Sequence, residues 1–223
     1  MIDTTALTRT RIQDPGAIGC AWRNRTPGVW PKDGRLLIVA ADHPARGALF
    51  VRGALRMASR SDLLDRLVTA LARPGVDGVL ASPDILDDLL LLGALEGKVV
   101  IGSMNRGGLD GAVWTMDDRF TGYDAASIAA NRLEGGKMLL RIDDQDPGTA
   151  HTLQGCADAV SELAAAGLMA MVEPLPYRRG ADGQLRLLKD VPSLARAITV
   201  ASPSASRTSS VWTCASAGPS RRT

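Results

Sequence analysis

The stretch from Gly135 to Asp144 places residues that could do chemistry within the pattern of a buried strand. Its sequence is GGKMLLRIDD. In an extended strand alternate side chains point to opposite faces, so Lys137, Arg141 and Asp143 share one face and apolar side chains fill the other. This pattern fits a solvated edge strand, and it equally fits a strand whose charged face lines an active site.

The charged residues of this strand could act on a carbonyl group. A lysine amine attacks a carbonyl carbon when burial or a nearby cation lowers its pKa, and Arg141 lies two positions further along the same face. A carboxylate close by can carry the protons. The chain contains only four lysines, so a lysine within a predicted strand is notable.

The elements that would position this strand alternate along the chain. Strands are expected at residues 35–44, 75–83, 98–104, 135–144 and 168–174, and helices at 59–72, 85–95, 124–133, 152–166 and from about 192. Strands rich in Val, Ile and Leu that alternate with helices predict a parallel α/β fold. Polar residues follow several strands at their carboxyl ends, where barrels of this class build their sites. We therefore expect a (β/α)8 TIM-barrel type fold, incomplete, with five or six β/α units present.

The chain divides into three parts on this interpretation. Residues 1–34 form an N-terminal segment that caps the barrel, residues 35–201 form the partial barrel, and residues 202–223 are an irregular tail. The tail is rich in Ser, Arg and Ala and has no Leu or Ile, so it is expected to be disordered or to follow a loss of reading frame near Ser202. The abrupt change of amino-acid composition near Ser202 favours the loss of reading frame. An open partial barrel exposes apolar edges, which makes a homo-oligomer possible.

Composition narrows the partners and the compartment. The 26 Lys and Arg against 24 Asp and Glu leave a formal charge of +2, so no nucleic-acid or membrane partner is expected. Cys20, Cys156 and Cys214 are far apart and have no metal-ligand spacing, which favours a reducing cytoplasm. The start of the chain lacks the apolar core of a signal peptide. No stretch is long and apolar enough for a membrane span.

Three motifs in order resemble the class I, Schiff-base aldolase superfamily of barrels, which includes deoxyribose-phosphate, fructose-bisphosphate and tagatose-bisphosphate aldolases. These motifs read LIVAADHP, GGKMLLRIDDQDPGT and GLMAMVEPLP and lie between Arg35 and Ala201. The resemblance implies a lyase of carbohydrate metabolism that reversibly cleaves a carbon–carbon bond of a small sugar or sugar phosphate, with no metal and no organic cofactor. It places the catalytic groups at Asp42, Lys137 and Glu173.

The substrate contacts are less specific. Arg141 and Asp143 share the face of Lys137 and are expected to contact substrate. Asn105 and Arg106 begin a glycine-rich loop that could hold a substrate phosphate, or could be a surface turn. The sequence does not identify the substrate itself, because rim loops vary freely on this fold.

The sequence departs from the aldolase pattern in one respect, and several of the selected residues also have plainer structural interpretations. In these aldolases the Schiff-base lysine lies on the sixth strand, and this chain has no lysine after Lys189. The Schiff-base activity of this chain is therefore expected to be impaired, and the alternative is an inactive truncated barrel that binds a ligand or oligomerises at most. Lys137 could be a buried charge that pairs with a neighbouring acid, and Asp42 could be a cap at a strand end. A metal site formed by the two histidines with Asp42 and Glu173 has only weak support.

Overall fold

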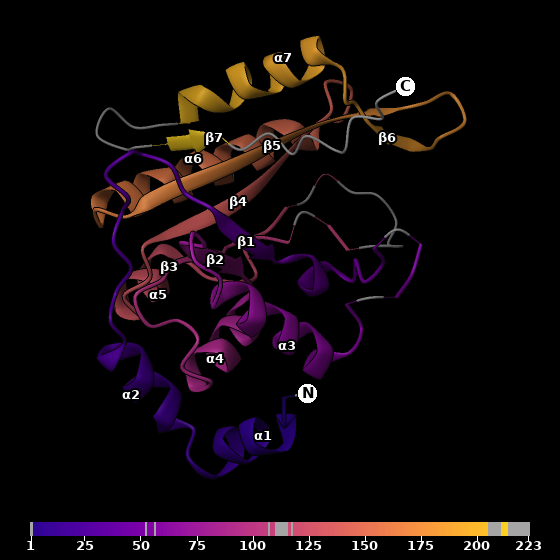
Figure 1. Cartoon of the computed structure of the whole chain (residues 1–223). Helices are drawn as coiled ribbons and strands as arrows, with labels where there is room; N and C mark the ends of the chain where they lie inside the picture. Colours follow the sequence, from indigo (N-terminus) through magenta and orange to yellow (C-terminus); the bar gives the residue numbers. More distant parts are fainter. Residues whose placement is uncertain are drawn as a thin grey trace. The chain divides into compact units, whose positions relative to one another are not determined.

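The structure is a computed structural model that describes residues 2–51, 53–55, 57–106, 108–109, 116, 118–204 and 211–213. By its internal contacts the chain divides into two compact units. Unit 1 comprises residues 1–103 and 126–135, and unit 2 comprises residues 104–125 and 136–223. Each unit is an α/β structure (Figure 1).

Unit 1 contains three parallel strands, β1 (Ile38–Ala41), β2 (Gly78–Ala81) and β3 (Val99–Ser103). The helices are α1 (Thr4–Gln13), α2 (Gly16–Asn24), α3 (Arg60–Leu71), α4 (Pro83–Leu91) and α5 (Ala125–Ala130), and a short 3-10 helix, η1 (His43–Arg46), follows β1. Every residue of β2 and β3 is buried, as expected of strands covered on both faces.

The amphipathic helices of unit 1 follow directly from the sequence. Ser59 caps α3, whose buried leucines recur at the spacing of one helix face. Ser82 precedes α4, and Pro83 occupies its first turn, where a missing N–H costs nothing. The expected helices at 59–72 and 85–95 are confirmed to within a few residues.

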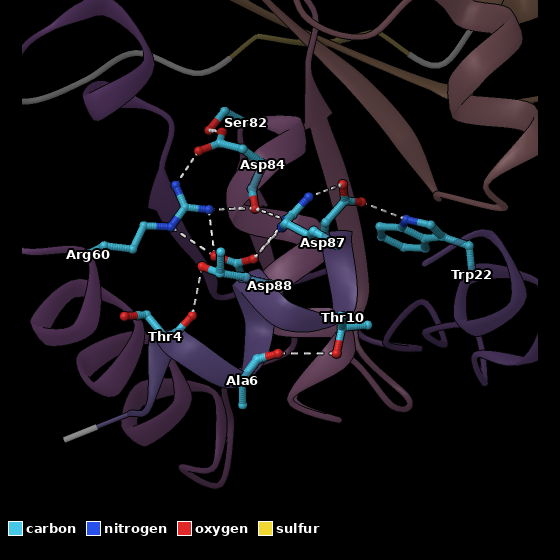
Figure 2. A network of polar contacts seen from close by, with 11 residues as sticks. Thr4, Ala6, Thr10, Trp22, Arg60, Ser82, Asp84, Asp87 and Asp88 are labelled. Atoms are coloured by element: carbon cyan, nitrogen blue, oxygen red, sulfur yellow. Dashed lines mark hydrogen bonds and ion pairs between the residues drawn. The ribbon is translucent and has the colours of Figure 1, made fainter. Parts of the chain in front are cut away.

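The two N-terminal helices were not predicted, and polar contacts with α4 hold them in place. In α1 only Leu7 is buried, so the helix has no apolar stripe to recognise in the sequence. Arg11 of α1 donates to Asp88 at 2.7 Å. The indole of Trp22 in α2 donates to Asp87 at 2.9 Å (Figure 2). These contacts join helices that neither propensity nor periodicity would connect.

Unit 2 contains β4 (Gly135–Ile142), β5 (Met169–Arg179), β6 (Leu185–Leu187) and β7 (Val211–Thr213), with β4 and β6 as neighbours of β5 in the sheet. Its helices are α6 (Gly148–Ala165) and α7 (Val191–Ala201), followed by the 3-10 helix η2 (Ser202–Ser204). Both long helices pack against β5 (Figure 1). β6 returns antiparallel to the end of β5, whereas β7 pairs in parallel with its first half.

The expected (β/α)8 barrel is wrong for the described part of the chain. That part contains seven strands in a mixed, mostly parallel arrangement, and β1 pairs with β2 alone. After β5 the chain turns back into an antiparallel strand where a barrel would have a helix. The sequence correctly predicted the alternation of strands and helices and the polar residues at the strand ends. An open sheet and a closed barrel both have these two features, so they do not distinguish the two folds.

The expected tail begins with η2 and includes β7, a short strand that the composition of residues 202–223 did not predict. Most of that tail, residues 205–210 and 214–223, lies outside the described residues. Among the described helices, none has the length and apolar character needed to cross a membrane.

Candidate functional site

The charged face of β4 is buried, which answers the question raised by its sequence. Lys137 is 2% exposed, and Arg141 and Asp143 are each 4% exposed. A solvated edge strand is thereby excluded. Charged side chains at this depth need partners, because an isolated buried charge is very costly.

Lys137 pairs with Glu173 on the neighbouring strand β5. The distance from Nζ to Oε2 is 2.7 Å, and the side chains of Lys137 and Glu173 are 3% and 19% exposed. The structure thus brings together two of the three predicted catalytic residues. The same contact is the neighbouring-acid pair considered as the plainer interpretation of Lys137.

Arg141 is bound by Asp118, a residue that the sequence analysis did not select. Arg141 donates from Nε to Asp118 Oδ2 at 2.9 Å and from Nη2 to Oδ1. The Asp118 side chain is only 1% exposed. This carboxylate compensates the guanidinium charge, so the cation considered beside Lys137 is part of an ion pair. The two residues are 23 positions apart, and no local pattern links them.

Gly108 closes the other side of the Arg141 guanidinium. Its φ is +83°, and a Cβ built on it would lie 2.6 Å from Nη1 of Arg141. Only glycine combines this backbone conformation with so close an approach. The glycine-rich loop after β3 therefore packs against Arg141 at this residue.

The side-chain amide of Asn105 hydrogen-bonds to the backbone of β4. Its Nδ2 donates to Leu139 O at 2.8 Å, and its Oδ1 accepts from Leu139 N at 2.8 Å. With both ends of its amide engaged, Asn105 supports the strand, and its expected contact with substrate stays a prediction. Arg106, the next residue, is exposed.

Asp143 turns the chain from β4 toward α6. Its Oδ1 accepts from Gln145 N at 3.1 Å, and its backbone oxygen accepts from the Thr149 hydroxyl at 2.6 Å. Asp143 also lines a cavity, which is described below.

Asp42 belongs to unit 1 and follows β1 directly. It is 8% exposed, and its Oδ1 lies 3.4 Å from Nδ1 of His43. Asp42 is the N-terminal cap residue of η1, yet its side chain makes no capping hydrogen bond there. This counts against the plainer interpretation of Asp42 as a cap.

With this geometry described, the chain can be compared with known proteins. The model of the Cgl0159-like family matches residues 34–216. The chain belongs to the Cgl0159-like family. It is also similar to the crystal structure of Cgl0159 from Corynebacterium glutamicum, with 43% identity and a TM-score of 0.90 over 95% of this chain and 72% of that chain. A search of curated proteins finds no match.

Membership of the Cgl0159-like family establishes the relationship but does not test the chemistry. Neither the family description nor the name of the structural neighbour mentions an activity. The resemblance to class I aldolases therefore stays a prediction. Within the described residues, no three His, Cys, Asp or Glu side chains are grouped so that they could hold a metal ion.

The three carboxylates of α4 in this Cgl0159-like chain, Asp84, Asp87 and Asp88, are structural. Arg60 binds Asp84, and it also donates to Asp88 Oδ2 from Nη2 at 2.6 Å (Figure 2). Burial raises the pKa of Asp87, although hydrogen bonds from Trp22 and Arg11 act in the opposite direction. All three acids of α4 are engaged by arginine or tryptophan, so the group holds helices together and does not present a site.

Proposed function

We propose that this protein is an aldolase-like lyase that acts on the carbonyl group of a small sugar or sugar phosphate. The observation that carries the proposal is the buried contact of 2.7 Å between Lys137 Nζ and Glu173 Oε2. It joins the amine and the carboxylate that the resemblance to class I aldolases assigns to the reacting centre.

In class I aldolases the Schiff-base lysine lies on the sixth strand, and in this proposal Lys137 takes its role. The Lys137–Glu173 pair has the groups that Schiff-base chemistry needs. Glu173 takes a proton from the Lys137 ammonium, and the neutral amine adds to the carbonyl carbon to give a carbinolamine. Glu173 returns the proton as water leaves, and an iminium forms. Cleavage of the neighbouring carbon–carbon bond then sends its electron pair into the iminium, while a base removes the proton of the substrate hydroxyl. The iminium is itself the electron sink, so the proposed reaction needs no organic cofactor.

The test is reduction with borohydride in the presence of dihydroxyacetone phosphate, glyceraldehyde 3-phosphate or acetaldehyde, read by intact mass and peptide mapping. We expect a stable adduct on Lys137. The adduct should be lost in Lys137→Arg, which keeps the positive charge, and its formation should slow in Glu173→Gln.

Lys98 provides the matched control. It is also partly buried, but its Nζ donates to a backbone oxygen, Val76 O, at 2.7 Å and has no carboxylate partner in the described structure. Lys98→Arg should leave the adduct on Lys137 unchanged. If borohydride gives no adduct with any of the three carbonyl compounds, or labels Lys98 as readily as Lys137, the Schiff-base proposal is wrong.

A second candidate is a protein that binds a ligand without catalysis. It is favoured by the engagement of Arg141 with Asp118 and of Asn105 with Leu139, which occupies two of the predicted substrate contacts. Saturable binding of a sugar phosphate without any trapped adduct would favour this candidate.

We also assign the protein to the cytoplasm. Cys20 and Cys156 are free thiols in the described structure, which agrees with a reducing compartment.

A further inference from the structure

A small cavity in unit 2 lies at the end of β4 and has its own set of polar groups. Its volume is about 140 Å³. Its walls come from the end of β4 and the residues after it (142–145), from β5 (176–178), from Leu188, and from Ser193 and Arg196 in α7. All of these segments belong to the same unit.

The cavity is separate from the Lys137–Glu173 pair. Asp143 is six residues beyond Lys137, which in an extended chain corresponds to roughly 20 Å. Ile142, which lines the cavity, alternates onto the face of β4 opposite Lys137, whereas Asp143 continues the face of Lys137 beyond the end of the strand. A ligand that fills so small a cavity would not reach the lysine, so its binding can be tested apart from the Schiff-base chemistry, although Asp143 is also one of the expected substrate contacts.

Asp143 provides a buried acceptor at this cavity. The residue is 4% exposed, and its Oδ1 accepts a hydrogen bond from Gln145 N. No described residue donates to the other oxygen, Oδ2, and this atom is not among the fully buried side-chain atoms that lack a partner, so solvent or a ligand can reach it. Hydroxyl groups of a ligand are suitable donors to it.

Two arginines provide positive charge at the same cavity. Arg178 is exposed and makes no side-chain hydrogen bond or close ion pair with the described residues. Its charge acts only weakly on the carboxylate of Asp190, which caps the N-terminus of α7. Arg196 pairs with Asp144 at 2.9 Å, with both side chains 56% exposed. An exposed pair of this kind contributes little and can exchange partners. A guanidinium binds phosphate or carboxylate through two parallel hydrogen bonds.

We propose that this cavity binds a small anionic polyol, with Asp143 accepting from its hydroxyl groups and Arg178 binding its phosphate or carboxylate. Ile142, Pro176 and Leu188 contact the carbon chain of the ligand. The side-chain hydroxyl of Ser193 is available as a further donor or acceptor.

The test is an NMR titration of the 15N-labelled full chain with glycerol 3-phosphate and, separately, with glycerate. Comparison of the two ligands distinguishes a phosphate from a carboxylate as the anionic group. Glycerol and inorganic phosphate serve as the two fragments. We expect saturable shifts of the Gln145 and Ser193 amides with at least one of the two anionic polyols, and weaker binding of both fragments.

Two variants test which residue binds each end of the ligand. Arg178→Gln should weaken binding about tenfold or more, because a charge-assisted bidentate contact is lost. Asp143→Asn should also weaken binding, and it can keep the Gln145 hydrogen bond through its own Oδ1. Arg179→Gln is the matched control, because Arg179 is the next residue, does not line the cavity, and donates to Gly183 O at 2.7 Å.

Several results would overturn the proposal. These are the absence of saturable binding of either polyol up to about 10 mM, equal weakening by Arg178→Gln and Arg179→Gln, or binding of phosphate alone as tight as that of glycerol 3-phosphate. Because Arg178 is exposed, Arg178→Gln should fold. This variant therefore tests the proposed anion contact even if Asp143→Asn is unstable. Failure of this test would leave the borohydride result on Lys137 unaffected.

Discussion

Replacing Glu173 with glutamine removes the countercharge of a buried lysine, so its cost can be worked out from the structure. Lys137 loses its ion-pair partner at a site where its side chain is 3% exposed. Breaking a buried pair in this way costs about 3–5 kcal/mol. Glu173 is 19% exposed and glutamine still offers an acceptor, so we expect a loss near 3 kcal/mol, roughly a hundredfold change in the folding equilibrium.

The assay is urea unfolding followed by circular dichroism, together with hydrogen exchange of the β4 amides, which reports on unit 2 directly. The double variant Lys137→Met with Glu173→Gln should recover most of the lost stability, because it leaves no unpaired charge. Asp182→Asn is the control for an exposed pair. Asp182 and Arg186 are 50% and 59% exposed, and the loss of their pair should have a much smaller effect.

Two outcomes would refute this reasoning. If Glu173→Gln destabilises the protein no more than Asp182→Asn, the Lys137–Glu173 contact is not a buried ion pair. If the double variant is as unstable as the sum of the two single variants, the two side chains do not interact.

Four further predictions concern other parts of the chain. Gly28→Ala should destabilise by more than about 2 kcal/mol in urea unfolding, because its Cβ would lie 2.3 Å from a backbone nitrogen of β3. Gly97→Ala, with φ +67° and open space, should cost about 1 kcal/mol. Iodoacetamide should label exposed Cys20 but not native Cys156, since burial and a nearby carboxylate raise the pKa of the Cys156 thiol to about 12; equal labelling of both, read by peptide mapping, would contradict this. Burial opposes ionisation of Asp84, but hydrogen bonds from a serine and an arginine hold its pKa below the usual value. Its stabilising effect should therefore be present above about pH 4 and lost as the pH falls through the folded-state pKa, so in urea unfolding Asp84→Asn should be less sensitive to acid than the wild type.

The sequence was sufficient for elements whose own residues determine their structure. The five expected strands and the helices between them appear where apolar periodicity and capping residues placed them, with β4 and α3 as clear cases. The N-terminal helices were missed because α1 buries a single residue and depends on the contact between Arg11 and Asp88. Such a contact joins residues 77 positions apart and leaves no local signal.

The same limit applies to the candidate site. Alternation along β4 correctly placed Lys137 and Arg141 on one face, but it could not identify which carboxylate each of them would meet. Closure of the sheet was also beyond the sequence, because strand order and the return of β6 depend on long-range pairing. A parallel α/β pattern alone does not distinguish an open sheet from a barrel.

The two ion pairs of β4 differ in a way that bears on function. Arg141 donates two hydrogen bonds to a carboxylate that is 1% exposed, and Gly108 closes its other side. Such a pair is suited to fixing a strand. Lys137 is no more exposed than Arg141, but its partner Glu173 is 19% exposed and can exchange protons with solvent or substrate. If β4 carries chemistry, the chemistry therefore belongs to the lysine pair, while the arginine pair keeps the strand in position.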